Sequence, residues 1–178
     1  MTDATERALT PTSYLVLGLL ARQGPCTPYQ LKQQVHQTVG LFWSFPHSQL
    51  YAEPRKLTRD GLLEETQEEQ GRRRRFYAIT EQGRLALQSW LGEPSDALIE
   101  VRALGLLKLF FGDQATGEQR EALAQMQAET HGELADRLEE LEKLASSADP
   151  GSSTHSLLLL GARTMRTIAE FWDEQLLR

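Results

Sequence analysis

The stretch LLEETQEEQGRRRRFYAIT, residues 62–80, decides the fold of this chain. Four glutamates precede Gly71, four arginines follow it, and the tail then alternates so that Arg75, Tyr77 and Ile79 share one side. Such alternation is typical of a β-strand with one buried face, and a glycine permits a tight turn. A dense arginine run is normally only a solvated surface. With a strand on each flank, the stretch instead predicts a two-stranded hairpin with a basic tip.

Upstream of the hairpin, the sequence predicts three helices. The first follows the candidate N-cap Thr10, with proline at its first position, and Gly24 with the proline after it marks the stop. The second follows Thr27 in the same way, and the third contains Leu50 and Leu57, seven residues apart. Three helices followed by a hairpin form a winged helix-turn-helix. A wing lies along the DNA duplex, where phosphates attract guanidinium groups.

The third helix has a polar face opposite its leucines. At about 100° per residue, this face contains Ser48, Ala52, Arg55 and Arg59, with His47 and Tyr51 at one border and Gln49 and Lys56 at the other. These side chains supply the donors, acceptors and cations that contact bases and phosphates.

The two halves of the chain differ in charge. Residues 1–94 carry 11 Lys and Arg against 10 Asp and Glu, a net of +1, whereas the remainder carries 8 against 15, a net of −7. The boundary falls in LGEPSD, which is typical of a linker. The overall charge of −6 therefore does not argue against a nucleic-acid partner for the first half.

The second half predicts long helices. SDALIEVRALGLLKLFFGD is apolar on most sides, and a capping box at Thr116 and Gln119 opens a helix of roughly thirty residues. SSADPGSS separates that helix from a last one over about 154–177. Each long helix has an apolar seam, and the simplest partner for both is the same pair in a second subunit.

Four segments resemble the PadR-type transcriptional regulators over residues 10–92: SYLVLGLL, TPYQLKQQV, LFWSFPHSQLYAEPRKLTRDGLLEE and RRRRFYAITEQGRLALQSWL. FWSFPHSQLY with a long helical second half is most similar to the branch that includes the virulence-activator proteins. The resemblance implies a winged-helix DNA-binding domain in a dimer, whose interface is built by the first helix and the C-terminal helices. It also implies that Leu50 is core, that Tyr51 touches the backbone or groove of DNA, and that Tyr29 contacts a phosphate.

One residue departs from the family pattern. Pro54 stands where the family usually has leucine, and a proline inside a helix costs about 3 kcal/mol. The third helix is therefore expected either to kink at Glu53 and Pro54 or to divide there. This departure affects the contacts expected from Arg55 and Arg59 more than those from His47 and Ser48.

These patterns predict a mainly α protein with a winged helix-turn-helix domain of three helices and a two-stranded wing over residues 1–92. A helical dimerisation domain follows over 95–178. The expected DNA contacts are Tyr29, His47, Ser48, Gln49, Tyr51, Arg55, Arg72, Arg73, Arg74 and Arg75. The expected dimer contacts are Leu15, Leu19, Leu134, Leu138, Leu141, Met165, Ile168 and Trp172. The expected function is that of a homodimeric regulator, more commonly a repressor, that reads an inverted repeat in double-stranded DNA.

Two alternatives stay open. One is a dimeric helical interaction module whose winged helix has lost its DNA affinity. The other is a regulator that responds to a small aromatic or amphipathic effector, held in a cavity lined by Trp90, Met126, Met165, Phe171 and Trp172. Plain core or dimer packing is the commoner role for such residues.

Several other classes are excluded by what the sequence lacks. It has no glycine-rich phosphate loop, nucleophile elbow or paired-histidine zinc motif, so no enzyme activity is expected. A single cysteine, Cys26, and four scattered histidines predict no disulfide, metal site or cofactor. Cys26 is expected to be a small residue in the turn between the first two helices and not a redox sensor. The absence of a secretion signal, and of an apolar run of about 18 residues, predicts a cytoplasmic protein without membrane contact.

Overall fold

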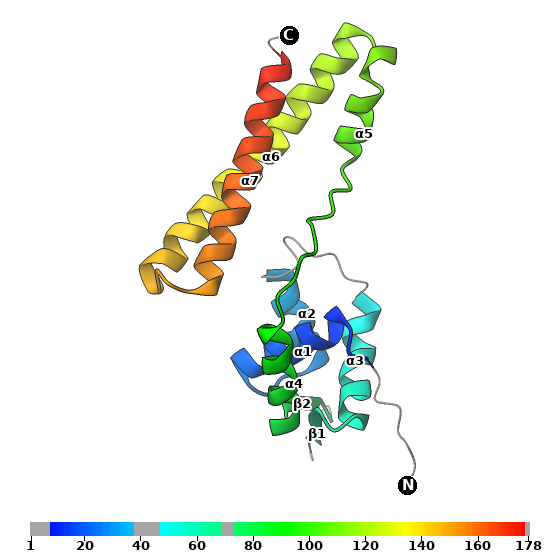
Figure 1. Ribbon diagram of the computed structural model, residues 1–178, viewed down its shortest axis with the longest axis vertical. Helices are drawn as coiled ribbons and strands as arrows, with labels where there is room; N and C mark the ends of the chain where they lie inside the picture. The colour runs from blue at the N-terminus through cyan, green and yellow to red at the C-terminus, as the bar shows by residue number, and fades with distance from the viewer. Residues whose placement is uncertain (1–7, 38–46, 69–72, 177–178) are drawn as a thin grey trace. The chain divides into compact units, whose positions relative to one another are not determined.

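The computed structural model describes residues 8–37, 47–68 and 73–176. The chain divides into two compact units, Met1–Ala97 and Leu98–Arg178. Each unit has its own hydrophobic core. Figure 1 shows the helices and strands of both units. Among the described residues, no helix is both long enough and apolar enough to cross a membrane.

The first unit is a winged helix-turn-helix, as the sequence predicts. Its elements are α1 (Pro11–Gln23), α2 (Pro28–Gln37), α3 (His47–Arg59), β1 (Leu63–Gln67), β2 (Arg75–Ile79) and α4 (Glu81–Gly92). The core gathers apolar side chains from all three leading helices and from both strands, including Val16, Leu31, Leu50, Leu63 and Tyr77. The predicted fold class is confirmed: a mainly helical chain with a two-stranded antiparallel wing.

Capping residues fix where the helices begin. Thr10 and Ser13 form a reciprocal capping box at α1, and Gly24 ends that helix with a φ of 79° that favours glycine. Thr27 and Gln30 exchange the same pair of bonds at α2, with N to O distances of 2.8 and 3.3 Å. These starts are the ones predicted from the sequence.

The wing is paired on both edges of β2. Strand β1 pairs with it in antiparallel register from Leu63 opposite Ile79 to Gln67 opposite Arg75. On the other edge, Tyr77 exchanges two backbone hydrogen bonds with Cys26, at 3.1 and 2.9 Å. The turn between α1 and α2 therefore holds the wing to the helical part of the unit, which no sequence pattern predicts.

Helix α3 runs without a break through Pro54, so of the two outcomes expected there the division is wrong, and the kink stays a prediction. Pro54 is fully buried, as are Leu50 and Leu57. Close packing of the ring contributes apolar burial that offsets the missing backbone hydrogen bond. One turn later, the Thr58 hydroxyl donates to the Pro54 carbonyl over 2.9 Å. Arg55 and Arg59 thus belong to the same helix as Ser48.

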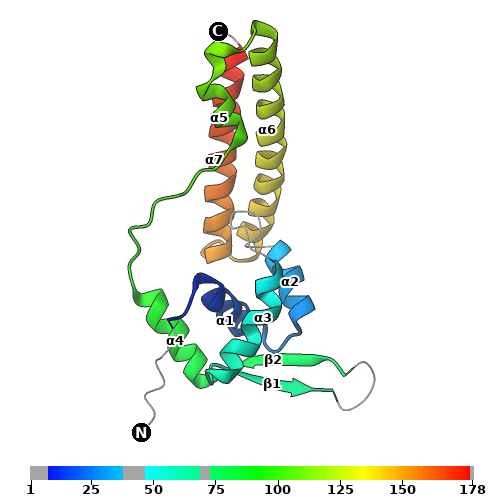
Figure 2. The same cartoon turned by 90° about the vertical axis from the view of Figure 1, so that its right-hand side faces the viewer.

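The second unit contains α5 (Leu104–Phe110), the short 3-10 helix η2 (Gly112–Gln114), α6 (Gly117–Ala148) and α7 (Ser153–Leu176). The two long helices run side by side in opposite directions in both views (Figures 1 and 2). Their buried residues are mostly alanines, which allow the helices to approach closely: Ala124, Ala128 and Ala135 on α6, and Ala162 and Ala169 on α7. Leu138 and Trp172 complete this buried set.

Helix α5 is shorter than the apolar stretch that contains it. Residues 94–103 have no regular structure, and the helix begins only at Leu104. It packs on α6 closely enough that a Cβ at Gly105 would lie 2.3 Å from Oε1 of Gln127. The opposite side of α5 leaves Leu104, Leu107 and Phe110 exposed.

Candidate nucleic-acid interface

The outward face of α3 is polar and accessible. Ser48, Tyr51, Ala52, Arg55 and Arg59 are exposed, whereas Leu50 and Leu57 on the opposite side have no exposed surface. This is the division predicted from the helical periodicity. Such a face presents hydroxyls and guanidinium groups to a groove while the leucines hold the helix on the core.

Two hydrogen bonds fasten α3 to the start of α1. The Thr12 hydroxyl donates to Oε1 of Gln49 over 3.0 Å, and one turn further along α3 the Ser13 hydroxyl donates to Oε1 of Glu53 over 2.7 Å. Nζ of Lys56 lies 3.2 Å from the other oxygen of the Glu53 carboxylate. Glu53 is only 4 % exposed, so these partners satisfy a buried charge. The contacts of Thr12, Ser13 and Glu53 between α1 and α3 were not predicted from the sequence. The one available indication was an acidic residue next to Pro54, on the side of the helix that carries Leu50 and Leu57.

The arginines of the wing are engaged with glutamates of the opposite strand. The Arg74 guanidinium donates through Nε to both oxygens of Glu68, at 3.0 and 3.1 Å, and lies over the Phe76 ring. This cation lowers the pKa of the Glu68 carboxyl below its ordinary value. Arg75 makes a second pair, with 2.9 Å between its guanidinium nitrogen and Oε1 of Glu65. Sequence reasoning placed these acids in the hairpin but did not foresee the pairs.

Arg73 has a different environment from its neighbours. It adopts a left-handed backbone conformation, with a φ of 48°, and its carbonyl accepts from the Gln67 side chain over 3.2 Å. Its exposed side chain stands at the edge of the described part of the wing. Arg72 and the tip before it lie outside the described residues.

Tyr77 links the wing to α3. Its ring is buried, and burial raises the pKa of its hydroxyl, as does a hydrogen bond with Glu65, whereas a hydrogen bond with Arg55 acts in the opposite direction. Arg55 is thereby positioned between the helix face and the wing. Arg75 pairs with the same Glu65, so Glu65 and Tyr77 connect the two arginines.

Tyr29 and His47 are the two remaining predicted DNA contacts, and only the side chain of Tyr29 is described. Tyr29 on α2 is 61 % exposed, and its hydroxyl accepts from Nε2 of Gln33 over 3.2 Å. His47 is the first residue of α3, but its side chain lies outside the described part of the structure.

The predicted dimer contacts fall into two groups. Leu19, Leu138 and Trp172 are buried within the chain, so in this conformation they have almost no surface to offer a partner. These side chains pack within their own chain. The periodicity of apolar residues does not distinguish such packing from a subunit interface. Leu15, Leu134, Met165 and Ile168 are half-buried, and Leu141 is exposed.

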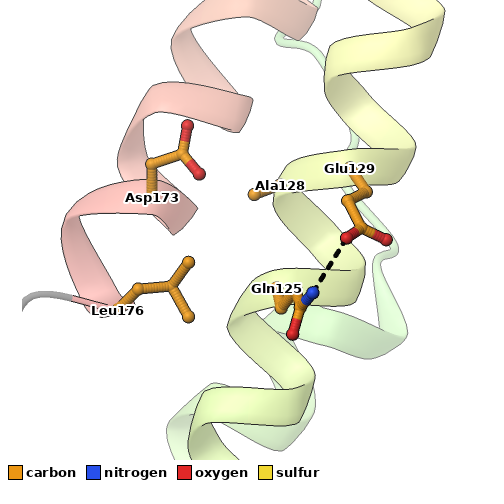
Figure 3. Close-up of a pocket in the computed structure, with 5 residues that line it drawn as sticks. All are labelled: Gln125, Ala128, Glu129, Asp173 and Leu176. Atoms are coloured by element: carbon orange, nitrogen blue, oxygen red, sulfur yellow. Dashed lines mark hydrogen bonds between the residues drawn. The ribbon is translucent and has the colours of Figure 1, made fainter.

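The residues considered for an effector cavity have different surroundings. Trp90 stacks on Tyr14 with 4.5 Å between ring centroids, Trp172 fills the core between α6 and α7, and Met126 and Phe171 are exposed. A hollow of about 390 Å³ does lie between α6 and α7, but other residues line it (Figure 3). Asp173 and Leu176 point from α7 toward α6, where Gln125 donates to Glu129 over 3.0 Å. The carboxylates of Glu129 and Asp173, and the wide opening of this hollow, make it a poor site for an aromatic or amphipathic effector.

Cys26 is not placed for redox chemistry. Its side chain is buried, and burial raises the pKa of its thiol to about 11. The nucleophilic thiolate is therefore scarce at neutral pH. Among the described residues, no group of three or more His, Cys, Asp or Glu side chains is arranged to hold a metal ion.

Comparison with known proteins gives consistent matches. The model of the transcriptional regulator PadR-like family matches residues 16–89. The negative transcriptional regulator PadR of Bacillus subtilis is 30 % identical over 172 residues, which cover 92 % of this chain and 94 % of the relative. The crystal structure of Bacillus subtilis PadR in complex with operator DNA has a TM-score of 0.82 at 24 % identity, covering 96 % of this chain and 98 % of that one. The Vibrio cholerae virulence activator AphA has a TM-score of 0.63 at 25 % identity, covering 93 % and 95 %.

Proposed function

The chain belongs to the PadR-like family of transcriptional regulators, which are not enzymes, and from this premise we propose that it represses transcription as a homodimer bound to an inverted-repeat operator. The relative named as a negative regulator supports repression as the outcome. The observation that carries the proposal is the outward polar face of α3, together with the wing, where Arg75 begins β2 and Arg73 and Arg74 precede it. In this family fold, two such faces related by a dimer axis read two half-sites in successive major grooves.

Each part of the face has a distinct proposed role. Ser48, Gln49 and Tyr51, with His47, approach base edges and the nearby backbone, because the first residues of a recognition helix enter the groove most deeply. Tyr29, Arg72, Arg73 and Arg75 contact phosphates or a narrow minor groove, which fixes the register of the protein without reading sequence. Arg74 is held by Glu68 and reaches a phosphate only when that pair opens. Arg55 lies between these two sets through its bond with Tyr77.

Exposed apolar side chains of the second unit support the proposed homodimer. Ile99 and Phe110 keep 80 % and 78 % of their surface, and Leu104 and Leu107, which lie between them in the sequence, are also exposed. A group of large apolar side chains left in water is typical of an interaction surface. We propose that a second copy covers it, together with Leu141 and the half-buried Leu15, Leu134, Met165 and Ile168.

Sedimentation over a range of concentrations tests the dimer. The wild-type chain should sediment with twice the mass of the 20.1 kDa chain. Phe110→Asp should shift it to the single-chain mass with an unchanged circular dichroism spectrum, because this side chain makes few contacts within its own chain. A wild-type chain that stays monomeric, or a dimer indifferent to Phe110→Asp, contradicts the surface assigned here.

DNA binding is tested by fluorescence anisotropy with the upstream region of the protein's own gene and a scrambled duplex of equal length. Arg73→Ala should weaken binding to both duplexes by a similar factor and flatten the salt dependence by about 0.9 in log–log slope. Arg137→Ala is the matched control, since it removes the same charge from an exposed position on α6 in the other unit. Equal affinity for the two duplexes with no salt response would favour the helical interaction module.

A small aromatic effector is a separate proposal. It rests on a relative, since Bacillus subtilis PadR has been solved in complex with p-coumaric acid. Quenching of tryptophan fluorescence by p-coumaric acid, together with release of bound DNA, tests it. Quenching without release, or neither effect, would contradict it.

A further inference from the structure

Gln49 is not a free surface amide. Its Oε1 accepts a hydrogen bond of 3.0 Å from the Thr12 hydroxyl, which belongs to a residue only 9 % exposed at the start of α1. Gln49 itself is exposed and is the third residue of α3. The amide oxygen is therefore held toward α1, and the amide nitrogen, on the other side of the same carbon, faces away from it.

The position of Thr12 explains why its proton goes to Gln49. Threonines in the middle of these helices donate to a carbonyl one turn earlier, as Thr58 does to Pro54 and Thr164 to Leu160. Thr12 is the second residue of α1, so no carbonyl of its own helix lies one turn before it. The Thr12 hydroxyl can therefore donate its proton to Gln49 on α3. The hydrogen bond between Ser13, the next residue of α1, and Glu53 on α3 keeps the two helices close enough for this contact.

We propose that Thr12 sets the base preference of Gln49, an inference that rests on the proposed function. A glutamine that recognises adenine uses its oxygen and its nitrogen together, accepting from N6 and donating to N7. Because the Thr12 hydroxyl holds the amide oxygen toward α1, Gln49 turns its amide nitrogen outward and presents donors to the groove. These donors match O6 and N7 of guanine or O4 of thymine, whereas at adenine they match N7 alone and the bond to N6 is lost. Each half-site should then favour guanine or thymine over adenine at the position that Gln49 reads.

Selection from a randomised duplex library tests this with four proteins: the wild type, Gln49→Ala, Thr12→Val and Thr12→Ser. Gln49→Ala identifies the position, because it should relax the preference at one base pair per half-site. Thr12→Val keeps the shape of the side chain and frees the amide, so adenine should gain at that position by about fivefold relative to guanine or thymine, the equivalent of one neutral hydrogen bond. Thr12→Ser retains the hydroxyl and should select the wild-type sequence.

The possible outcomes distinguish a failure of this inference from a failure of the proposed function. Adenine selected by the wild type at the Gln49 position, or an unchanged preference in Thr12→Val, overturns the role of Thr12 alone. An equal loss of affinity of Thr12→Val for every duplex also overturns it, since that would mark a purely structural residue. If the wild type enriches no sequence at all, the proposed function itself fails, and the inference fails with it.

Discussion

Gly83 marks the closest approach between α4 and the wing, and replacing it by alanine should be severe. A Cβ at this position would lie 2.2 Å from the carbonyl oxygen of Leu62 and 2.9 Å from Cγ1 of Ile79. The first of these contacts is with backbone, which cannot turn aside as a side chain can. The same Leu62 oxygen accepts from the backbone N–H of Thr80 over 3.1 Å, and the Thr80 hydroxyl caps α4 by accepting from Gly83 N–H. To relieve the clash, the backbone at Leu62 must move away from α4, which strains its hydrogen bond with Thr80, the residue that caps α4.

The magnitude follows from these contacts. Overpacking a tight site costs about 1–3 kcal/mol, and the loss of a hydrogen bond adds about 1 kcal/mol. Alanine recovers about 0.5–1 kcal/mol over glycine inside a helix. The net destabilisation is then about 1–3.5 kcal/mol. For a domain of this size it should lower the melting temperature by at least about 4 °C and by as much as about 25 °C.

Gly92→Ala is the matched control, because it makes the same substitution in the same helix at a site with no atom within 4 Å of the new Cβ. Thermal and urea unfolding followed by circular dichroism should show Gly92→Ala at or slightly above the wild type and Gly83→Ala far below both. A melting temperature for Gly83→Ala within about 2 °C of the control would refute the reasoning, since that shift corresponds to less than 1 kcal/mol.

Three further predictions concern the wing, the buried thiol and the contact between α1 and α3. Glu68→Gln should release Arg74 for a phosphate, so that the salt dependence of binding to any duplex steepens by about 0.9 and a fourfold dilution of salt gains an extra factor of about three; unchanged anisotropy titrations would show that Arg74 stays off the DNA. The Cys26 thiol has its pKa raised from 9.0 to about 11, so the unfolded chain releases this proton first as pH rises; its contribution to stability is complete below about pH 9 and is lost toward pH 11. Cys26→Ala should therefore lose less stability than the wild type across that window in urea titrations, and parallel losses would contradict the assignment. Ser13→Ala should cost about 1–3 kcal/mol because it removes the 2.7 Å hydrogen bond to the buried Glu53 side chain, whereas adding Ser13→Ala to Glu53→Gln should cost less than it does alone; additive losses in urea unfolding would mean that the two side chains do not interact.

The sequence predicted the winged-helix unit because each of its elements leaves a local signal. Caps at Thr10 and Thr27 mark helix starts, and the alternation of Arg75, Tyr77 and Ile79 marks a strand, so a few neighbouring residues are enough to locate each element. Long-range contacts leave no such signal. The pairing of Cys26 with Tyr77, and the bond between Thr12 and Gln49, join residues far apart in the chain whose individual types suit many other surroundings.

The same limit explains the seams of the second unit. Leu138 and Trp172 stand at helical spacing on long helices, and periodicity shows that such residues must be covered without showing by what. In the structure, α6 and α7 cover each other, because their alanines bring the helices close enough to enclose those larger side chains. The most exposed apolar residues, Leu98, Ile99 and Phe110, instead lie in and before α5, where the run is too short and too evenly apolar to show a face.

The buried carboxylate of Glu53 constrains how this sequence can diverge. If Glu53 is replaced first, the Ser13 hydroxyl keeps its partner in Thr10, 3.0 Å away, and little is lost. If Ser13 is replaced first, the Glu53 side chain stays buried and loses the hydroxyl that donates to its Oε1. Substitution at the acid should therefore precede substitution at the hydroxyl along any lineage, and living descendants with the acid but without the hydroxyl should be rare.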